Sequence, residues 1–339
     1  MCVSEMSLKI AVIENYKRFV DNLKKHLSVP VDFVIIDDAK NPKNFHLIED
    51  ADIIFGSRVN EELLKHAKKA KVIQVIGAGI RLELLEVARK FPNILLANSH
   101  GNAIAVAEHA IALMMAVAKH IPQYDKRFRQ GIWSLETDTY NVQLHGKVLG
   151  VLGLGHIGRE IARMGKCLGM KVYAIKRHPL EQIKKELNLD YLGSINDLFT
   201  VLKASDFVVI ALPKTPETHN LIGENELKAL KKTAYLINIS RGDIVNEAAL
   251  FKALKERWFS GAGLDVWYIY PKRPAKEEDQ QTYPSKYPFH ELDNVVMTPH
   301  IAWKTPESMD NMLLEIAKNI ERLYKGQELI NIVNKDLGY

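Results

Sequence analysis

Residues 148–177 read VLGVLGLGHIGREIARMGKCLGMKVYAIKR and contain the clearest structural pattern of this chain. An apolar, β-branched run over residues 148–152 leads into the pattern Gly153-x-Gly155-x-x-Gly158, and an amphipathic segment then leads to a second apolar run. Strand, glycine turn, helix and strand in this order are the context in which such a pattern binds a dinucleotide. Gly153 allows the tight turn, Gly155 lets a pyrophosphate approach the backbone, and Gly158 lets the helix pack on the strand.

The segment therefore predicts a βαβ unit with a dinucleotide at its glycine turn. The start of the helix adds free N–H groups and the positive end of the helix dipole, both of which attract phosphate. The expected contacts come from the turn and the first helical residues: Gly153, Gly155, His156, Ile157 and Gly158.

The alternation of short apolar strands and amphipathic helices extends over the rest of the chain. Strands are expected at residues 9–13, 31–36, 52–56 and 71–77, and, after a long helix over residues 105–121, at 147–155, 170–176, 206–212, 234–239, 261–266 and 294–299. Continuous apolar strands separated by helices indicate parallel sheets covered on both faces. We predict an α/β protein with two doubly wound parallel-sheet domains, which 339 residues are enough to form.

Composition excludes several other classes of protein. The net charge is +5 and the basic residues are scattered, so we expect solvated faces and no nucleic-acid partner. No apolar run has membrane-spanning length and the first residues lack a secretory core, so we expect a cytoplasmic protein without a membrane partner. Two cysteines, Cys2 and Cys167, do not indicate a disulfide framework, and Cys167 is expected to pack within its helix. We assign no metal ligands.

The residues after the second strand of the βαβ unit indicate which dinucleotide binds. An NAD enzyme places an acid there to accept hydrogen bonds from the adenine ribose, whereas this chain has Lys176, Arg177 and His178. Cations cannot accept those bonds, but they pair well with a 2′-phosphate. Lys176 and Arg177 therefore favour NADP(H) over NAD(H), and the use of both remains open.

Over nearly its whole length the chain resembles the D-isomer-specific 2-hydroxyacid dehydrogenase family, and in particular glyoxylate/hydroxypyruvate reductases. Besides the glycine turn, the resemblance is carried by NSHGNAIAVAEHAIAL (98–113), the segment 211–250 with its block LINISRGDIVNE, GAGLDV (261–266) and MTPHIA (297–302). It implies a flavodoxin-like substrate domain made of residues 1–100 and 301–339 and a Rossmann cofactor domain made of residues 101–300. It also implies a homodimer, an active site between the domains and reduction of a small 2-oxoacid to a D-2-hydroxyacid.

The resemblance assigns roles residue by residue. Arg241 matches the arginine that binds the substrate carboxylate and carbonyl, which suits a guanidinium because its planar fork binds oxyanions bidentately. His300 matches the acid/base that protonates the developing alkoxide, which suits a group that titrates near neutrality. Asp265 matches a residue that contacts the nicotinamide amide. The remaining matches are Pro213 and Thr215 beside the adenine, Thr218 among the coenzyme-binding residues, Ser240 and Arg241 beside the nicotinamide ribose, and Gly77, Ala78, Gly79, Ile80 and Asn102 beside the substrate.

One position departs from the family pattern. Where the family pairs its histidine with a glutamate just before a proline, this chain has Tyr270 before Pro271. A nearby carboxylate raises the pKa of a histidine, whereas a neutral phenol does not. We therefore count Tyr270 with Arg241 and His300 as catalytic residues, and expect His300 to be less basic than in glutamate-containing relatives.

Alternatives remain open at this position. Formate dehydrogenases of the same superfamily also lack the glutamate, and formate oxidation needs no proton acceptor on the substrate. A second alternative is that the loop over residues 272–288 supplies a charge from Glu277, Glu278 or Asp279. A third is a protein that senses NAD(P) without turning it over.

Overall fold

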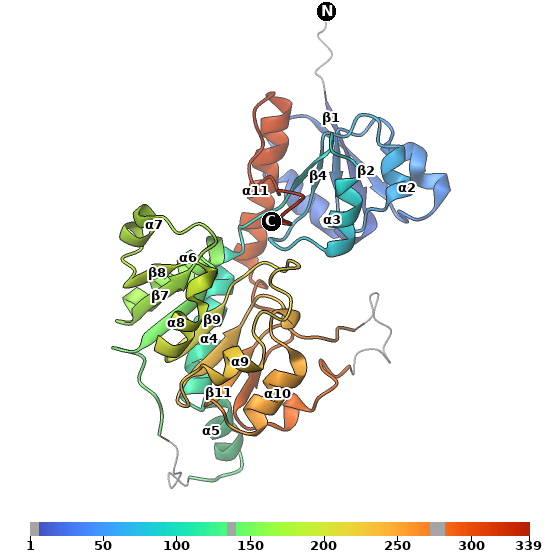
Figure 1. The fold of residues 1–339 in the computed structure, drawn as a ribbon. Helices are drawn as coiled ribbons and strands as arrows, with labels where there is room; N and C mark the ends of the chain where they lie inside the picture. Colours follow the sequence, from blue (N-terminus) through green and yellow to red (C-terminus); the bar gives the residue numbers. More distant parts are fainter. Residues whose placement is uncertain (1–6, 134–139, 272–281) are drawn as a thin grey trace, which may run out of the picture. The chain divides into compact units, whose positions relative to one another are not determined.

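The computed structural model describes residues 7–133, 140–271 and 282–339, and Figure 1 traces its helices and strands. The chain divides into two compact units. Unit 1 contains residues 1–102 and 304–339, and unit 2 contains residues 103–303. The Glu277, Glu278 and Asp279 carboxylates and the loop before Thr282 lie outside the described residues.

Unit 1 is built on a five-stranded parallel sheet in the order β2-β1-β3-β4-β5, which is the flavodoxin-like order 2-1-3-4-5. On β1, Ile10 and Val12 face one side, against α1 and α11, while Ala11 and Ile13 face the other, with α2 and α3. The strands are β1 (Leu8–Ile13), β2 (Val31–Ile36), β3 (Ile53–Phe55), β4 (Val72–Gln74) and β5 (Leu95–Ala97), and the helices are α1 (Val20–Lys24), α2 (Glu61–Lys65), α3 (Leu82–Arg89) and α11 (Pro306–Tyr324).

Unit 2 is built on a seven-stranded parallel sheet in the order β12-β11-β10-β9-β6-β7-β8. Counted from β6, this is the Rossmann order 3-2-1-4-5-6 with one further strand, so the prediction of two doubly wound α/β sheets is confirmed. The strands are β6 (Val148–Leu152), β7 (Lys171–Ile175), β8 (Tyr191–Gly193), β9 (Phe207–Ile210), β10 (Tyr235–Asn238), β11 (Gly261–Leu264) and β12 (Val295–Met297), and the helices are α4 (Ala103–Ala118), α5 (Ile121–Phe128), α6 (His156–Cys167), α7 (Glu181–Glu186), α8 (Leu198–Ala204), α9 (Glu224–Lys228) and α10 (Glu247–Lys255).

Helix α4 lies against the sheet of unit 2, and small residues on β11 allow the close approach. A Cβ added at Gly263 would lie 2.9 Å from Leu113 Cβ, and one added at Gly261 would lie 3.2 Å from Val117. The single helix expected over residues 105–121 is wrong at its end. The helix stops at Ala118, His120 takes a left-handed conformation (φ 50°), and Pro122 lies in the first turn of α5.

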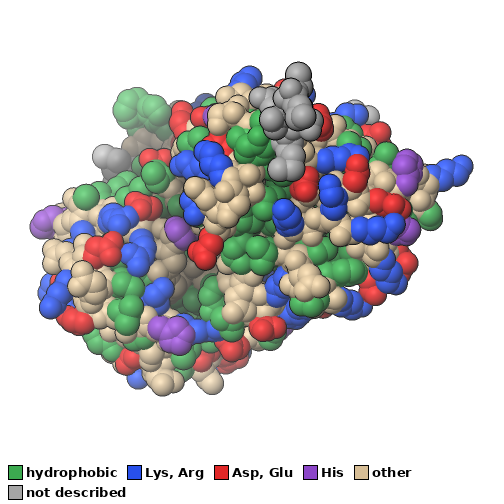
Figure 2. Space-filling model, turned by 90° about the horizontal axis from the view of Figure 1, so that it is seen from above, with side chains coloured by type: hydrophobic (Ala, Val, Ile, Leu, Met, Phe, Trp, Pro, Cys, Tyr) green, Lys and Arg blue, Asp and Glu red, His purple; other side chains and the backbone are tan. Residues whose placement is uncertain are grey.

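The surface carries interspersed charges. On the face shown in Figure 2, basic and acidic side chains alternate and do not gather into a patch of one sign. Among the described residues no single helix is both long and apolar enough for a membrane span, although α4 and α5 pass that test together across a bend of 61°. Cys167 is exposed, so the expectation that it packs is wrong: it lies at the last position of α6, where the helix face it occupies is uncovered.

Candidate active site at the carboxyl edge of the second sheet

The glycine turn follows β6, next to the point where the strand order of the sheet reverses, between β6 and β9. Gly153 has a φ of +100°, which other residues rarely adopt, and a Cβ at Gly158 would lie 2.0 Å from Gly153 O. Both positions therefore require glycine for packing. By contrast, nothing lies within 4 Å of the Cβ position of Gly155, where α6 begins. This open position beside a helix N-terminus fits a dinucleotide pyrophosphate.

The basic residues after β7 lie beside the start of α6. Burial, and then the positive charge of Arg159, lower the pKa of the half-buried Lys176. Arg159 Nη1 lies 3.2 Å from both carboxylate oxygens of Glu186, and Arg177 pairs with Glu217. Among the ion pairs of the described residues, none involves Lys176, so a phosphate bound here would meet a cation without a carboxylate partner.

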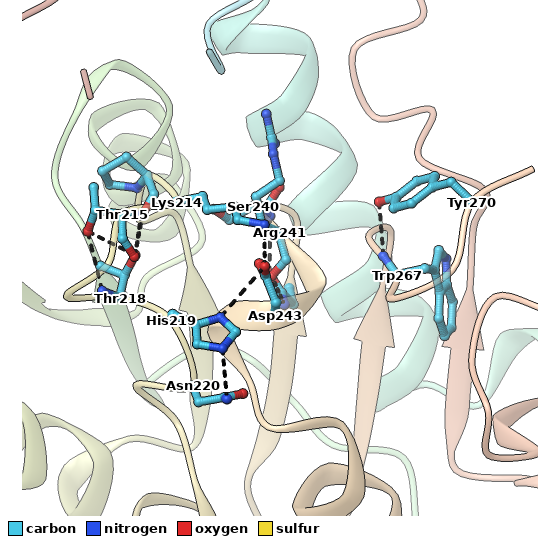
Figure 3. Close-up of polar contacts among 12 residues, drawn as sticks. Lys214, Thr215, Thr218, His219, Asn220, Ser240, Arg241, Asp243, Trp267 and Tyr270 are labelled. Carbon is cyan, nitrogen blue, oxygen red and sulfur yellow. Dashed lines mark hydrogen bonds and ion pairs between the residues drawn. The ribbon is translucent and has the colours of Figure 1, made fainter. Parts of the chain in front are cut away.

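The loop after β9 forms a compact turn (Figure 3). Thr218 Oγ1 donates to Pro213 O (2.7 Å) and accepts from the backbone N–H of Thr215 (2.8 Å). The hydroxyls of Thr215 and Thr218 are thus engaged within the loop and fix its shape. An adenine bound here would therefore contact the backbone of the loop and Pro213. Ser240, 8% exposed, donates its hydroxyl to Leu212 O and so ties the loop after β10 to the loop after β9.

Arg241 lies in the turn that follows β10, and the side chain of Asn238 holds this turn in place. The buried amide of Asn238 donates to Arg241 O (2.9 Å) and accepts from Ser240 N (3.1 Å), which closes the turn. Gly242 then touches the loop after β11, because a Cβ there would lie 2.4 Å from Trp267 O. Burial lowers the pKa of the Arg241 guanidinium from its ordinary value, while Tyr270 and then Asp243 act in the opposite direction. Arginine is the cation that keeps its charge under such desolvation.

The carboxylate of Asp243 contacts side chains of the loop after β9. Figure 3 shows Lys214 and His219 directed at its carboxylate, with His219 Nδ1 3.8 Å from Asp243 Oδ2. The Asp243 charge is therefore divided between these groups, and no described ion pair joins it to Arg241.

Asp265 holds the loop that carries His300. Its carboxylate is fully buried and accepts hydrogen bonds from Thr298 Oγ1 (2.6 Å), Ile301 N (2.9 Å) and Ala302 N (3.1 Å). His300 between these donors has a φ of 57°, a conformation that is uncommon outside glycine. Strained residues of this kind persist where the surroundings fix them, and they are frequent in active sites. Asp265 thus fixes the backbone directly after the histidine and holds the Thr298 side chain before it.

Tyr270 lies against the histidine ring. The ring centroids of Tyr270 and His300 are 5.5 Å apart at an interplanar angle of 56°, and the Tyr270 hydroxyl accepts from Trp267 N (3.1 Å; Figure 3). Although the residue is 44% exposed, desolvation raises the pKa of its phenol above the ordinary value of 10, with the Trp267 hydrogen bond and Arg241 acting in the opposite direction. The phenol is therefore neutral near pH 7.

The structure adds one histidine that the sequence did not single out. His109 on α4 lies with Nε2 3.0 Å from Thr298 Oγ1 and 3.5 Å from Asp265 Oδ1. It joins α4 to the ends of β11 and β12. Its contacts are 189 and 156 residues away in the sequence, so no local pattern could indicate them.

The predicted substrate residues Gly77, Ala78, Gly79, Ile80 and Asn102 belong to unit 1. Nothing lies within 4 Å of the Cβ position of Gly77, and Ala78 O accepts from Asn98 Nδ2 (2.8 Å). The Oδ1 atom of Asn102 is buried without a hydrogen-bond partner among the described residues. Space for a ligand is thus shown at Gly77, whereas Asn102 is buried at 8% exposure. The role of these residues in substrate binding stays a prediction.

A Rossmann sheet with an open glycine turn, and a half-buried arginine and a histidine loop at its carboxyl edge, define a nicotinamide-dependent oxidoreductase. Comparison with known proteins makes the assignment specific. Residues 111–302 match the model of the D-isomer specific 2-hydroxyacid dehydrogenase NAD-binding domain. The glyoxylate reductase of Pyrococcus furiosus is 34% identical over 86% of this chain and 84% of its own, and that of Thermococcus litoralis is 36% identical over 83% and 82%.

Comparison with solved structures supports the same family. The D-isomer specific 2-hydroxyacid dehydrogenase of Lactobacillus delbrueckii, in its NAD-complexed form, matches with a TM-score of 0.77 at 26% identity, over 96% of this chain and 100% of that one. The PH0520 protein of Pyrococcus horikoshii matches with a TM-score of 0.76 at 29% identity, over 98% and 96%. The chain belongs to the D-isomer-specific 2-hydroxyacid dehydrogenase family. It is an NAD(P)-dependent oxidoreductase of the D-2-hydroxyacid dehydrogenase type.

Proposed function

We propose that the physiological substrate is a 2-oxoacid of the size of glyoxylate and that Arg241 and His300 carry the reaction. The observation that carries the proposal is the convergence of the loops after β10, β11 and β12, which brings Arg241, Asp265, Tyr270 and His300 to one edge of the sheet. The glyoxylate reductase relatives support the size of the substrate.

Each residue has a separate task in this proposal. When bound, the nicotinamide supplies the hydride that reduces the carbonyl carbon. Arg241 binds the carboxylate and the carbonyl oxygen through its two N–H directions, and so orients the carbonyl and favours negative charge on its oxygen. His300 Nε2 or Nδ1 gives that oxygen a proton. Asp265 positions His300 through the backbone, and Tyr270 restrains its ring.

NADP(H) is the proposed coenzyme. Lys176 supports this choice because its pKa is lowered by burial and by Arg159, a situation that a 2′-phosphate would relieve. The Lactobacillus delbrueckii relative is solved with NAD, so NADH use by this chain stays open. NADH is expected to bind more weakly, because Lys176 and Arg177 cannot accept hydrogen bonds from the adenine ribose. The homodimer and the cytoplasmic location stay predictions.

Coenzyme oxidation tests the proposal. Glyoxylate, hydroxypyruvate, pyruvate and bulkier 2-oxoacids would be supplied with NADPH and, in parallel, with NADH, and the decrease in nicotinamide absorbance measured. We expect turnover with the two-carbon and three-carbon acids and a lower KM for NADPH. Tight coenzyme binding without turnover of any acid would instead support a coenzyme sensor, and oxidation of formate would support the formate-type alternative.

A further inference from the structure

The ion pair between Arg177 and Glu217 joins two loops that flank the glycine turn. Arg177 follows β7 and Glu217 lies in the loop after β9. In the sheet β6 lies between β7 and β9, so the pair connects the loops on either side of the strand that leads into Gly153. The pair therefore lies where the adenosine half of a dinucleotide would be held.

The position of Glu217 along its loop is fixed. Thr215 on one side and Thr218 on the other bond to each other's backbone N–H, at 3.3 Å for Thr218 N and 2.8 Å for Thr215 N. Thr215 is also buried, at 5% exposure. Glu217 is thus presented to the end of β7 by an ordered turn.

Three cations, Arg159, Lys176 and Arg177, flank the glycine turn here, and Glu186, which Arg159 shares with Arg163, and Glu217 are the carboxylates paired with them. Arg159 forms an ion pair with Glu186 and Arg177 forms one with Glu217, whereas the described residues provide no ion pair for Lys176. A 2′-phosphate carries about two negative charges. Lys176 can pair with one of them, and the other would have to pair with a cation that already forms an ion pair with a carboxylate. Arg177 is the candidate, because its partner is 71% exposed and exposed ion pairs are weak.

We propose that Glu217 competes with the coenzyme 2′-phosphate for Arg177 and thereby sets the ratio of NADPH to NADH affinity. This inference rests on the proposed function, in which the coenzyme binds at this glycine turn. With NADH the Arg177–Glu217 pair stays closed. With NADPH the phosphate takes Arg177, and the affinity for NADPH is lower than three cations alone would give.

Calorimetric titration of the full chain with NADPH and with NADH, and with 2′,5′-ADP and AMP as fragments, tests the inference without any turnover. Glu217→Gln keeps the shape of the side chain and removes its charge. We expect it to lower the dissociation constants of NADPH and 2′,5′-ADP about threefold to fivefold, with changes below about twofold for NADH and AMP. Asp293→Asn is the matched control, because Asp293 pairs with Arg257 before β12, at the opposite edge of the sheet.

A double substitution shows whether Arg177 carries the effect. In an Arg177→Gln background, Glu217→Gln should leave the NADPH to NADH ratio unchanged. The inference is overturned if Glu217→Gln alone leaves that ratio unchanged or lowers it while both coenzymes bind. Failure of the wild-type chain to bind either coenzyme would overturn the proposed function itself, so the two failures are distinguishable.

Discussion

Tyr270 stands where the family resemblance leads us to expect a glutamate beside the histidine. Its ring lies against His300 and its hydroxyl is held by Trp267 N. A phenol whose pKa is raised above 10 stays neutral throughout the range in which histidine titrates, so Tyr270 adds no charge beside the imidazole.

Tyr270→Glu would add that charge. A carboxylate near His300 stabilises imidazolium and raises the histidine pKa, so the proton needed for carbonyl reduction is retained at higher pH. We expect the alkaline limb of the reduction rate to move up by about one pH unit or more. The pH dependence of kcat/KM measures this, with Tyr270→Phe as the control that should leave the limb in place. An unmoved limb in a folded Tyr270→Glu protein would contradict this role.

Arg241→Lys tests the requirement for a fork of donors. Lysine keeps a positive charge but loses the bidentate geometry, and it is more readily neutralised at a buried position. We expect kcat/KM for a 2-oxoacid to fall about tenfold to a hundredfold, with little change in coenzyme affinity. An equal loss in coenzyme affinity and in kcat/KM would show that Arg241 serves the coenzyme instead.

At the scale of elements, the turn between β6 and α6 uses its glycines for two different reasons. Gly158→Ala would bring a methyl group to 2.0 Å from Gly153 O, so α6 would have to move away from β6. Gly155→Ala meets no protein atom within 4 Å and should leave the fold intact.

The two alanine substitutions should therefore separate stability from binding. We expect Gly158→Ala to lower the free energy of unfolding by about 2 kcal/mol or more. Gly155→Ala should keep the melting temperature and weaken coenzyme binding, because its methyl group occupies the path of the pyrophosphate. Denaturant unfolding and coenzyme titration would measure both. Unchanged coenzyme affinity in Gly155→Ala would place the dinucleotide elsewhere.

Helix α4 and the end of β12 are coupled by His109. We expect His109→Leu to lower kcat about tenfold, because Thr298 loses a partner and the His300 loop loses support. His109→Gln, which can still bond to Thr298, should restore much of the rate. The measurement is the steady-state kinetics of the two variants, with their melting temperatures compared to show that both are equally folded. A kcat for His109→Leu equal to that of the wild type would exclude a positioning role.

The sequence predicted these elements unequally. The strand, turn and helix over residues 148–167 were predictable because the apolar periods and the three glycines agree. The edge strands β5 and β8 were missed, since each has only three residues and, unlike the equally short β12, neither contains a β-branched residue. The predicted end of α4 was wrong because Ile121 continues the helical spacing of apolar residues beyond Ala118, although the backbone turns at His120.

For the whole molecule, the order of motifs carried more information than composition. Two series of apolar strands predicted two parallel sheets, and both are present with the expected flavodoxin-like and Rossmann orders. Arg241 and His300 could be named only through the family resemblance, because a lone arginine or histidine after a strand has no spacing of its own. His109, the Asp243 contacts and the partner of Arg177 depend on residues distant in sequence, so they required the structure.

A crystal structure of the chain with NADPH and oxamate, an unreactive analogue of a 2-oxoacid, would test the central assignment most directly. Under this assignment we expect the pyrophosphate at Gly155, the guanidinium of Arg241 on the oxamate oxygens, and a ring nitrogen of His300 within hydrogen-bonding distance of the oxygen that stands for the carbonyl. Oxamate bound away from both Arg241 and His300, with the coenzyme at the glycine turn, would contradict it.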